Sequence, residues 1–245
     1  MKYRLDRLLT ELVPELSRKQ AKDAIRAGRV TIDGVRTNDP ERKTDPEAEV
    51  VALTGRPLAY AQFRYFLLNK PAGVLSATRD KKQKTVLDLI SGIDKEKYFP
   101  VGRLDIDTEG LLLITNDGAL SHELLSPKKH VEKEYIAVCR GIFTDDTVAP
   151  LRTGVDLGDF TTAPAKVKVL SADAAAQTAE LSLAITEGKF HQVKRMVAAV
   201  GSEVLHLRRI RMGGMSLPQD LKEGEYRELS AEDLRKFREI IGGNE

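Results

Sequence analysis

Apolar residues recur with the two-residue period of a β-strand in several segments beyond residue 60. Within 179–185, Leu181, Leu183 and Ile185 fall on one face, which is the pattern of a strand with one side against a core. The run Leu111 to Ile114 is apolar throughout and lies between a glycine and a turn, which predicts a buried strand. Three more segments show strand patterns: 65–68, 135–139 and 166–169.

Helical periodicity is rarer in this part of the chain. Residues 119–125 give one helical signal. Four apolar residues follow the i, i+3, i+4, i+7 spacing of a buried helix face: Val193, Met196, Val197 and Val200. Strand runs mixed with isolated helices predict an α+β fold for residues 61–245.

The first part of the chain predicts a capped helix followed by a hairpin. Ser17 and Gln20 have the spacing of a capping box at a helix start. Gly28 stands where a glycine ends a helix. A strand at 29–32 and an Asp33-Gly34 hairpin turn follow.

A domain boundary is predicted near residue 60. Residues 38–57 are rich in Pro, Asp, Glu and Thr, so we expect a small domain at 1–60 and a larger one at 61–245. Charge also separates the two parts. Residues 1–38 hold nine Lys and Arg against five Asp and Glu, a net charge of +4, although the whole chain carries only +2.

The basic residues of the predicted first helix lie four positions apart, on one face: Arg18, Lys22 and Arg26. A basic helix face beside a hairpin suits the phosphates of a nucleic acid. From charge alone, a solvated helix face explains the same residues equally well.

Composition narrows the class of protein. Cys139 is the single cysteine of the chain, which excludes an internal disulfide, suits a reducing cytosol and fits a packed strand position. No apolar run reaches 18 residues and the first residues lack the apolar core of a signal peptide, so we expect a cytoplasmic protein without a membrane partner. Neither a phosphate-binding glycine loop nor a metal-ligand spacing occurs, so no cofactor or metal is expected.

The segment 102–118 carries the most informative chemistry. It places two carboxylates, Asp105 and Asp107, directly before the buried strand 111–114. Acids at this position lie at the edge of a sheet, where a cleft can form. Taken alone, such a pair is more often two turn residues that bond their own backbone.

With its neighbours, the segment 102–118 resembles the active-site motif of pseudouridine synthases, and most closely the family of the ribosomal small-subunit pseudouridine synthase A. Segments that resemble the other family motifs occur in the expected order, at 68–74, 133–135 and 187–196. The resemblance spans residues 64 to 232 or so. The first 60 residues resemble an S4-type RNA-binding domain, through Arg4-Leu5-Asp6, Ser17-Arg18, Gly28-Arg29-Val30 and Asp33-Gly34.

This resemblance implies a mixed, mostly antiparallel central sheet crossed by a cleft, and the isomerisation of uridine to pseudouridine. The reaction breaks the bond from C1′ to N1, turns the base and joins C1′ to C5 without a redox step, so it needs no cofactor. The resemblance gives the role of catalytic carboxylate to Asp105. The carboxylate either attacks C1′ as a nucleophile or assists loss of a sugar proton through a glycal.

The resemblance also assigns the surrounding residues. Lys194 is the cation beside the aspartate, at a position where the family often has Arg, and Tyr135 stacks on the target base. Arg103 enters the RNA beside the flipped nucleotide, and His191 and Gln192 belong to the basic motif that binds RNA. The alternatives are an exposed helix residue for Lys194, a strand-core tyrosine for Tyr135 and a surface phosphate contact for Arg103.

Two further expectations concern neighbouring charges. Asp107 is expected to bond the turn amides near Thr108 and Gly110. The cluster formed by Arg208, Arg209 and Arg211 is expected to meet phosphates, although a bare charge run is more often solvated.

The favoured function is therefore a ribosomal RNA pseudouridine synthase, acting as a monomer on 16S rRNA in the site class of uridine 516 or on a small-subunit assembly intermediate. The alternatives are a large-subunit (23S) enzyme of the same family and a non-catalytic ribosome-assembly factor that only binds RNA. A small-molecule hydrolase with an aspartate nucleophile is a third class, but it would not need the basic first domain.

Overall fold

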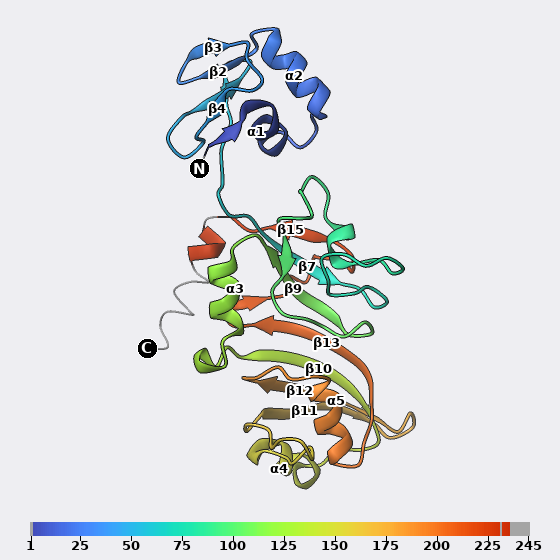
Figure 1. Ribbon diagram of the computed structural model, residues 1–245. Helices are drawn as coiled ribbons and strands as arrows, with labels where there is room; N and C mark the ends of the chain where they lie inside the picture. The colour runs from blue at the N-terminus through green and yellow to red at the C-terminus, as the bar shows by residue number, and fades with distance from the viewer. Residues whose placement is uncertain (1, 231, 236–245) are drawn as a thin grey trace. The chain divides into compact units, whose positions relative to one another are not determined.

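The computed structural model describes residues 2–230 and 232–235 and separates into two compact units (Figure 1). The first holds residues up to Phe63 together with Ile90–Asp94, and the second holds Arg64–Leu89 and the rest of the described chain from Lys95. The division at 1–60 and 61–245 stays a prediction. The segment 90–94 had no sequence signal that would group it with the first unit.

The first unit combines two helices with two small sheets. The helices are α1 (Leu5–Leu12) and α2 (Arg18–Arg26). One sheet pairs β1 (Tyr3–Arg4) with β4 (Lys43–Thr44), and the other has the order β3 (Val35–Thr37), β2 (Val30–Ile32), β5 (Val51–Leu53), β6 (Arg56–Pro57). The core is formed by the apolar faces of both helices against β2 and β5: Leu5, Leu8, Leu9, Ala21, Ala24, Ile25, Val30, Ile32 and Val51.

The predicted helix and hairpin of this unit are confirmed. Ser17 accepts from the amide of Gln20, and the Gln20 side chain accepts from the amide of Ser17, which completes the capping box. At the turn from β2 to β3, Asp33 and Gly34 have φ values of 51° and 81°. Two successive positive φ values are those of a type I′ hairpin turn, which explains the Asp-Gly pair.

The second unit is built on a nine-stranded sheet with the main order β11-β12-β10-β13-β9-β7-β15 (Figure 1). In addition, β14 pairs with β13, and β8 pairs with β9. The strands are β7 (Tyr65–Lys70), β8 (Phe99–Pro100), β9 (Glu109–Thr115), β10 (Lys133–Arg140), β11 (Lys166–Asp173), β12 (Thr178–Ile185), β13 (Val204–Met212), β14 (Met215–Ser216) and β15 (Tyr226–Glu228). Its helices are α3 (Gly118–Leu125), α4 (Asp145–Thr153) and α5 (Gln192–Ala199), with 3₁₀ turns η1 (Val86–Leu89) and η2 (Pro127–Lys129).

The α+β class and the mostly antiparallel sheet are confirmed. Every described strand pair is antiparallel except β9 with β13, which run parallel. In the second unit, each segment with a predicted strand pattern lies in a strand, and the helices predicted from 119–125 and from Val193, Met196 and Val197 are α3 and α5. Val200 follows the end of α5 instead of continuing its buried face.

Helix α4 has no counterpart in the sequence predictions. Thr144 caps it with Thr147 in place of the usual Glu or Gln, and Pro150 lies inside it. A proline inside a short segment normally indicates that the segment is not a helix. For this reason the sequence of residues 145–153 does not predict α4.

The parallel pair β9–β13 depends on one glycine. Gly110 has φ +100°, and a Cβ atom there would lie 2.2 Å from the carbonyl oxygen of Arg209. Any side chain at Gly110 would therefore push the two strands apart.

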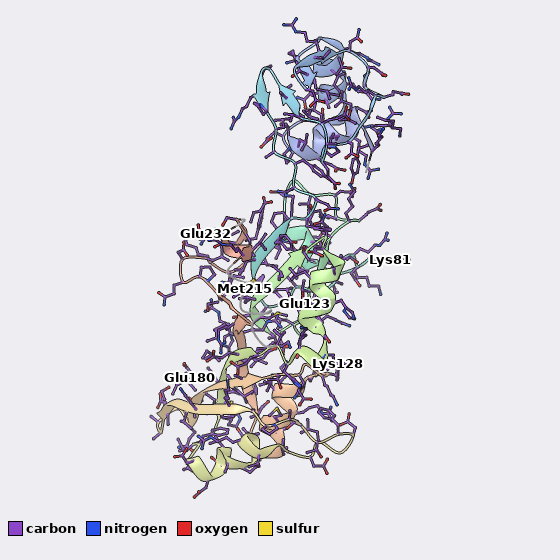
Figure 2. All side chains as sticks on the ribbon, turned by 90° about the vertical axis from the view of Figure 1, so that its left-hand side faces the viewer. Lys81, Glu123, Lys128, Glu180, Met215 and Glu232 are labelled. Atoms are coloured by element: carbon purple, nitrogen blue, oxygen red, sulfur yellow. The ribbon has the colours of Figure 1, made fainter. Side chains whose placement is uncertain are left out.

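The loop before η1 carries the exposed Lys81, which projects away from the sheet (Figure 2).

Candidate active site

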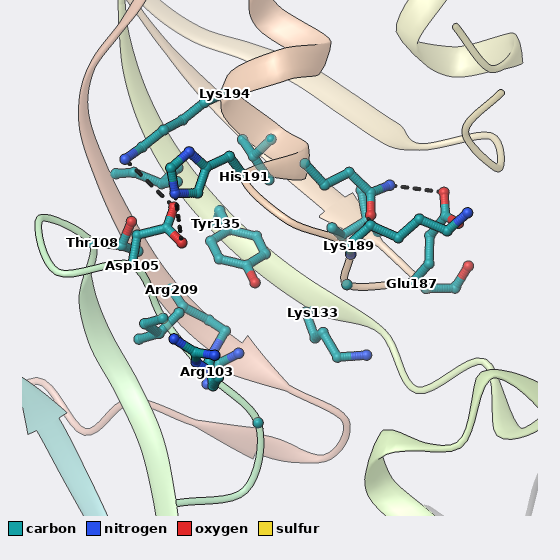
Figure 3. Close-up of a pocket in the computed structure, with 18 of the residues that line it drawn as sticks. Arg103, Asp105, Thr108, Lys133, Tyr135, Glu187, Lys189, His191, Lys194 and Arg209 are labelled. Carbon is teal, nitrogen blue, oxygen red and sulfur yellow. Dashed lines mark hydrogen bonds and ion pairs between the residues drawn. The ribbon is translucent and has the colours of Figure 1, made fainter. Parts of the chain in front are cut away.

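A cavity of about 270 Å³ opens in the second unit between the loop 102–108, strand β10 and the segment 185–194. Its size is near the lower end of ligand pockets, roughly 300 Å³ upward. Six residues predicted from the sequence line it together: Arg103, Asp105, Tyr135, His191, Gln192 and Lys194. Segments up to 91 positions apart in the chain thus converge on one concave site (Figure 3).

The loop that carries Asp105 is held by the segment 70–76. The Ser76 hydroxyl donates to the Leu104 carbonyl at 2.9 Å and accepts from the Leu104 amide at 3.1 Å. The Gly73 amide donates to Ile106 at 2.7 Å, and the Thr108 amide closes the turn onto the Asp105 carbonyl at 3.1 Å. The position of Asp105 is therefore set by backbone bonds on both sides of it.

Lys70 anchors the same loop from inside the protein. Its side chain is fully buried, and Nζ donates to the carbonyls of Pro71, Ile106 and Thr108 at 3.0, 3.3 and 2.8 Å. Burial lowers the pKa of Lys70 to about 8, against the opposing effect of nearby carboxylates. Lys70 is thus a positioning residue that ties β7 to the loop of Asp105.

Asp105 faces the side chains of Lys194 and His191, as the dashed lines in Figure 3 show. Lys194 Nζ lies 3.5 Å from Oδ2 of Asp105, and His191 Nε2 lies 3.5 Å from Oδ1. The Asp105 side chain is 27% exposed, at the wall of the cavity. Lys194 comes from α5 and acts as a single point of charge rather than a two-pronged donor.

Asp107 differs from the sequence expectation. Its carboxylate pairs with Lys194 Nζ at 2.6 Å instead of bonding the amides near Thr108 and Gly110. This hydrogen bond holds the pKa of Asp107 below its usual range. Asp107 is 66% exposed and does not line the cavity, so Lys194 links a carboxylate inside the site to one outside it.

Tyr135 lies in the middle of the site. It is 7% exposed on β10, in register with Leu183 of β12 and Arg209 of β13. Figure 3 shows its ring between the Asp105 carboxylate and the segment around Glu187 and Lys189. An aromatic face in this position can stack on a planar base.

The start of α5 forms another part of the cavity wall. His191 has the left-handed φ of 48°, and its ring stacks on the exposed Phe190 at 3.8 Å. The predicted RNA contact Gln192 is instead buried, and its amide binds the Glu187 carboxylate and the Lys189 amide. Gln192 therefore fixes the loop before α5, and a direct RNA contact by it stays a prediction.

Two buried cations of the cavity were missed as site residues. Lys133 on β10 donates to the Val131 carbonyl at 2.8 Å, and burial, with a smaller effect of Arg209, lowers its pKa to about 8. Arg209 was expected in a phosphate-contact cluster with Arg208 and Arg211, but it is 2% exposed and lines the cavity. Arg209 lies two positions after Leu207 on β13, so both side chains share the buried face of the strand. This spacing from an apolar residue is the sequence signal that could have placed Arg209 inward.

Arg211 also differs from the expected cluster. Its guanidinium pairs with Glu132 at 2.5 Å and Glu134 at 2.9 Å. These hydrogen bonds hold the pKa of Arg211 above its ordinary value. The Arg211 guanidinium is thus already paired with two carboxylates of the protein, instead of being free to meet phosphates.

The basic face of the first unit surrounds a buried acid. Asp6 is fully buried, and its carboxylate lies 3.2 Å from Arg4, 3.4 Å from Arg18 and 3.8 Å from Lys22. Burial alone would raise the pKa of Asp6, but Arg4 and Arg18 together lower it. Two of the three predicted RNA contacts of α2 thus also neutralise Asp6, while Arg26 is exposed.

Within residues 2–230 and 232–235, no group of three or more His, Cys, Asp and Glu side chains is arranged to hold a metal ion. None of the helices in that described part has the length and apolar character needed to cross a bilayer.

Comparisons with known proteins identify the family of the chain. The family model described as RNA pseudouridylate synthase matches residues 64–199, and the S4 domain model matches residues 4–50. The chain is 46% identical to an uncharacterized RNA pseudouridine synthase, YtzG, of Bacillus subtilis strain 168, over 96% of this chain and 98% of that protein.

Two further relatives cover nearly the whole chain. The ribosomal small subunit pseudouridine synthase A of Escherichia coli strain K12 is 41% identical over 94% of this chain and 98% of its own length. A crystal structure of a pseudouridylate synthase superposes with a TM-score of 0.66 at 34% identity, over 96% of this chain and 99% of that chain.

Proposed function

Because the chain belongs to the RNA pseudouridylate synthase family, and is therefore an isomerase with an S4 domain, we propose that it converts a uridine of ribosomal RNA to pseudouridine with Asp105 as the catalytic carboxylate. The observation that carries the assignment is the setting of Asp105. It is the carboxylate of the 102–108 loop that lines the cavity, it faces Lys194 and His191, and it lies beside Tyr135.

The reaction follows from this setting. The flipped base enters the cavity and stacks on Tyr135. Ionised Asp105 then meets the positive charge that develops on the sugar as the C1′–N1 bond breaks, either as a nucleophile at C1′ or on a path through a glycal. Lys194 stabilises the ionised carboxylate. The base turns, C1′ joins C5, the C5 proton leaves and N1 takes up a proton, so the product is an isomer of the substrate.

The preferred substrate is 16S rRNA, in the site class of uridine 516, or a small-subunit assembly intermediate. The name and the 41% identity of the Escherichia coli relative over nearly its full length support this choice. The exposed Arg18 and Arg26 and the partly exposed Lys22 supply phosphate contacts from the first unit. The protein acts as a monomer in the cytoplasm, where rRNA is assembled into ribosomes.

The alternative substrate is 23S rRNA, and the alternative class is a non-catalytic assembly factor. Mapping pseudouridines in 16S and 23S rRNA from cells with and without the gene separates all three. We expect one 16S site to lose its pseudouridine and to regain it with the wild-type gene but not with Asp105→Asn. Loss of a 23S site would support the large-subunit enzyme, and an unchanged map would support the assembly factor.

A further inference from the structure

Two residues that line the cavity carry buried polar side-chain atoms without a partner. Five such side-chain atoms occur in the described part of the chain, and two of them belong to residues that line the cavity: Nη2 of Arg209 and Oγ1 of Thr108. The two residues are 2% and 1% exposed. A buried donor without an acceptor is costly, by about 1–3 kcal/mol and more for a charged group, so its presence indicates a place prepared for a ligand.

Arg209 is held in position by the neighbouring strand. Its Nε donates to the Leu111 carbonyl of β9 at 2.8 Å. The close approach of β9 and β13 at Gly110 fixes the backbone of Arg209 itself. One edge of the guanidinium is thus tied to the sheet, and the other keeps Nη2 without an acceptor.

The charges around Arg209 favour a ligand with negative oxygen atoms. Lys133 lies near enough on β10 for Arg209 to help lower its pKa, and Figure 3 shows Arg103 beside Arg209. The two carboxylates that line the cavity already have partners. Asp105 faces Lys194 and His191, and Glu187 accepts from the Gln192 side chain and the Ala163 amide.

We infer that Arg209 donates from Nη2 to a carbonyl oxygen of the target uracil and stabilises the uracil anion during the isomerisation. This inference rests on the proposed function. When the C1′–N1 bond breaks, both electrons stay with the base, and the charge spreads over N1, O2 and O4. The guanidinium stays charged and meets that charge at one of the two oxygens. The charge disappears when C5 bonds to C1′, the C5 proton leaves and N1 is protonated.

A backbone phosphate is the competing ligand for this cation. Arg103 is exposed at the mouth of the cavity, whereas Arg209 is buried between β9 and β10. A phosphate stays with the RNA backbone, and the flipped base is the part that reaches inward. Burial therefore favours the base as the partner of Arg209.

The test compares single-turnover rates on RNA with uridine, 2-thiouridine or 4-thiouridine at the target position, because sulfur is a weak hydrogen-bond acceptor. For the wild type, one of the two thio substitutions should slow the reaction about tenfold, since a lost hydrogen bond of about 1.4 kcal/mol is a factor of ten. Arg209→Met should lower kcat by about 100-fold to 1,000-fold with little change in RNA affinity, and Arg209→Lys should recover part of it. In Arg209→Met, that thio substitution should have no further effect.

Controls separate this inference from folding and from the proposed function. Arg140→Met removes an exposed arginine of the neighbouring strand β10, which does not line the cavity, and should keep kcat. Equal thio effects in the wild type and Arg209→Met, or a loss only in RNA affinity, would overturn the inference. If Arg209→Met does not fold, a wild type insensitive to both thio substitutions overturns it as well. A wild type inactive on every uridine RNA contradicts the proposed function instead.

Discussion

Replacing Lys70 by Met tests how the Asp105 loop is held. Methionine nearly preserves the volume but removes the ammonium that donates to the carbonyls of Pro71, Ile106 and Thr108. Because these carbonyls lose a buried donor, the variant should be less stable at pH 7. It should also lose most of its turnover, since a displacement of about 1 Å in a reacting group can reduce the rate about 100-fold.

The pH dependence of this destabilisation can be calculated from the pKa of Lys70, which burial lowers from 10.5 to about 8. Between these values the unfolded chain holds a proton that the folded protein has released, so the contribution of Lys70 to stability rises with pH. From pH 7 to 9.5 this rise amounts to about 2 kcal/mol. Met does not titrate, so Lys70→Met should be about 2 kcal/mol more destabilising at pH 9.5 than at pH 7.

Urea unfolding followed by circular dichroism at the two pH values measures this difference. Lys133, whose pKa is also lowered to about 8, titrates in both proteins and cancels. Lys81→Met removes an exposed lysine and serves as the control (Figure 2). A destabilisation by Lys70→Met that is equal at both pH values, or smaller at the higher one, would refute the reasoning.

Three more predictions follow from the other charged groups. Lys194→Met should lower kcat by about 100-fold or more, because Asp105 and Asp107 lose their shared cation, whereas Lys194→Arg should keep much of it. Single-turnover rates on uridine RNA measure this difference, and near-normal turnover of the Met variant would exclude the role of Lys194. Arg26→Gln should reduce the slope of log binding constant against log salt concentration by about 0.7–0.9 without changing kcat. Filter binding at several salt concentrations measures this slope, and an unchanged slope would contradict a phosphate contact by Arg26. Asp6→Asn should destabilise the protein at neutral pH, and urea unfolding should show the difference shrinking below pH 3.8, as the lowered pKa of Asp6 is approached; a difference that grows in acid would contradict the ion-pair account.

The fold was predictable where one local pattern dominated. Leu181 and Leu183 repeat with the period of a strand and are fully buried in β12. The capping box at Ser17 and the Asp33-Gly34 turn need only neighbouring residues. Helix α4 was not predictable in this way, because Pro150 conflicts with helix propensity and packing against β11 overrides it.

The site was only partly predictable, because its geometry depends on distant segments. The motif segments contain Asp105, Tyr135 and Lys194, which the structure brings to one cavity. The partner of Asp107 could not be found locally, since Lys194 is 87 positions away. Arg209 depends in the same way on the parallel pairing of β13 with β9, whose Leu111 carbonyl is 98 positions away. A charge run shows that arginines are present but not which of them the sheet turns inward.

The most direct test of Asp105 as the catalytic carboxylate compares Asp105→Asn with Asp107→Asn. Tritium release from RNA labelled at C5 of uridine measures isomerisation, and filter binding measures RNA affinity. We expect Asp105→Asn to release no tritium while it binds RNA like the wild type, because the amide cannot serve the chemistry but leaves the phosphate contacts intact. Asp107→Asn should keep appreciable turnover, since its side chain lies outside the cavity. Turnover by Asp105→Asn together with an inactive Asp107→Asn would contradict the account.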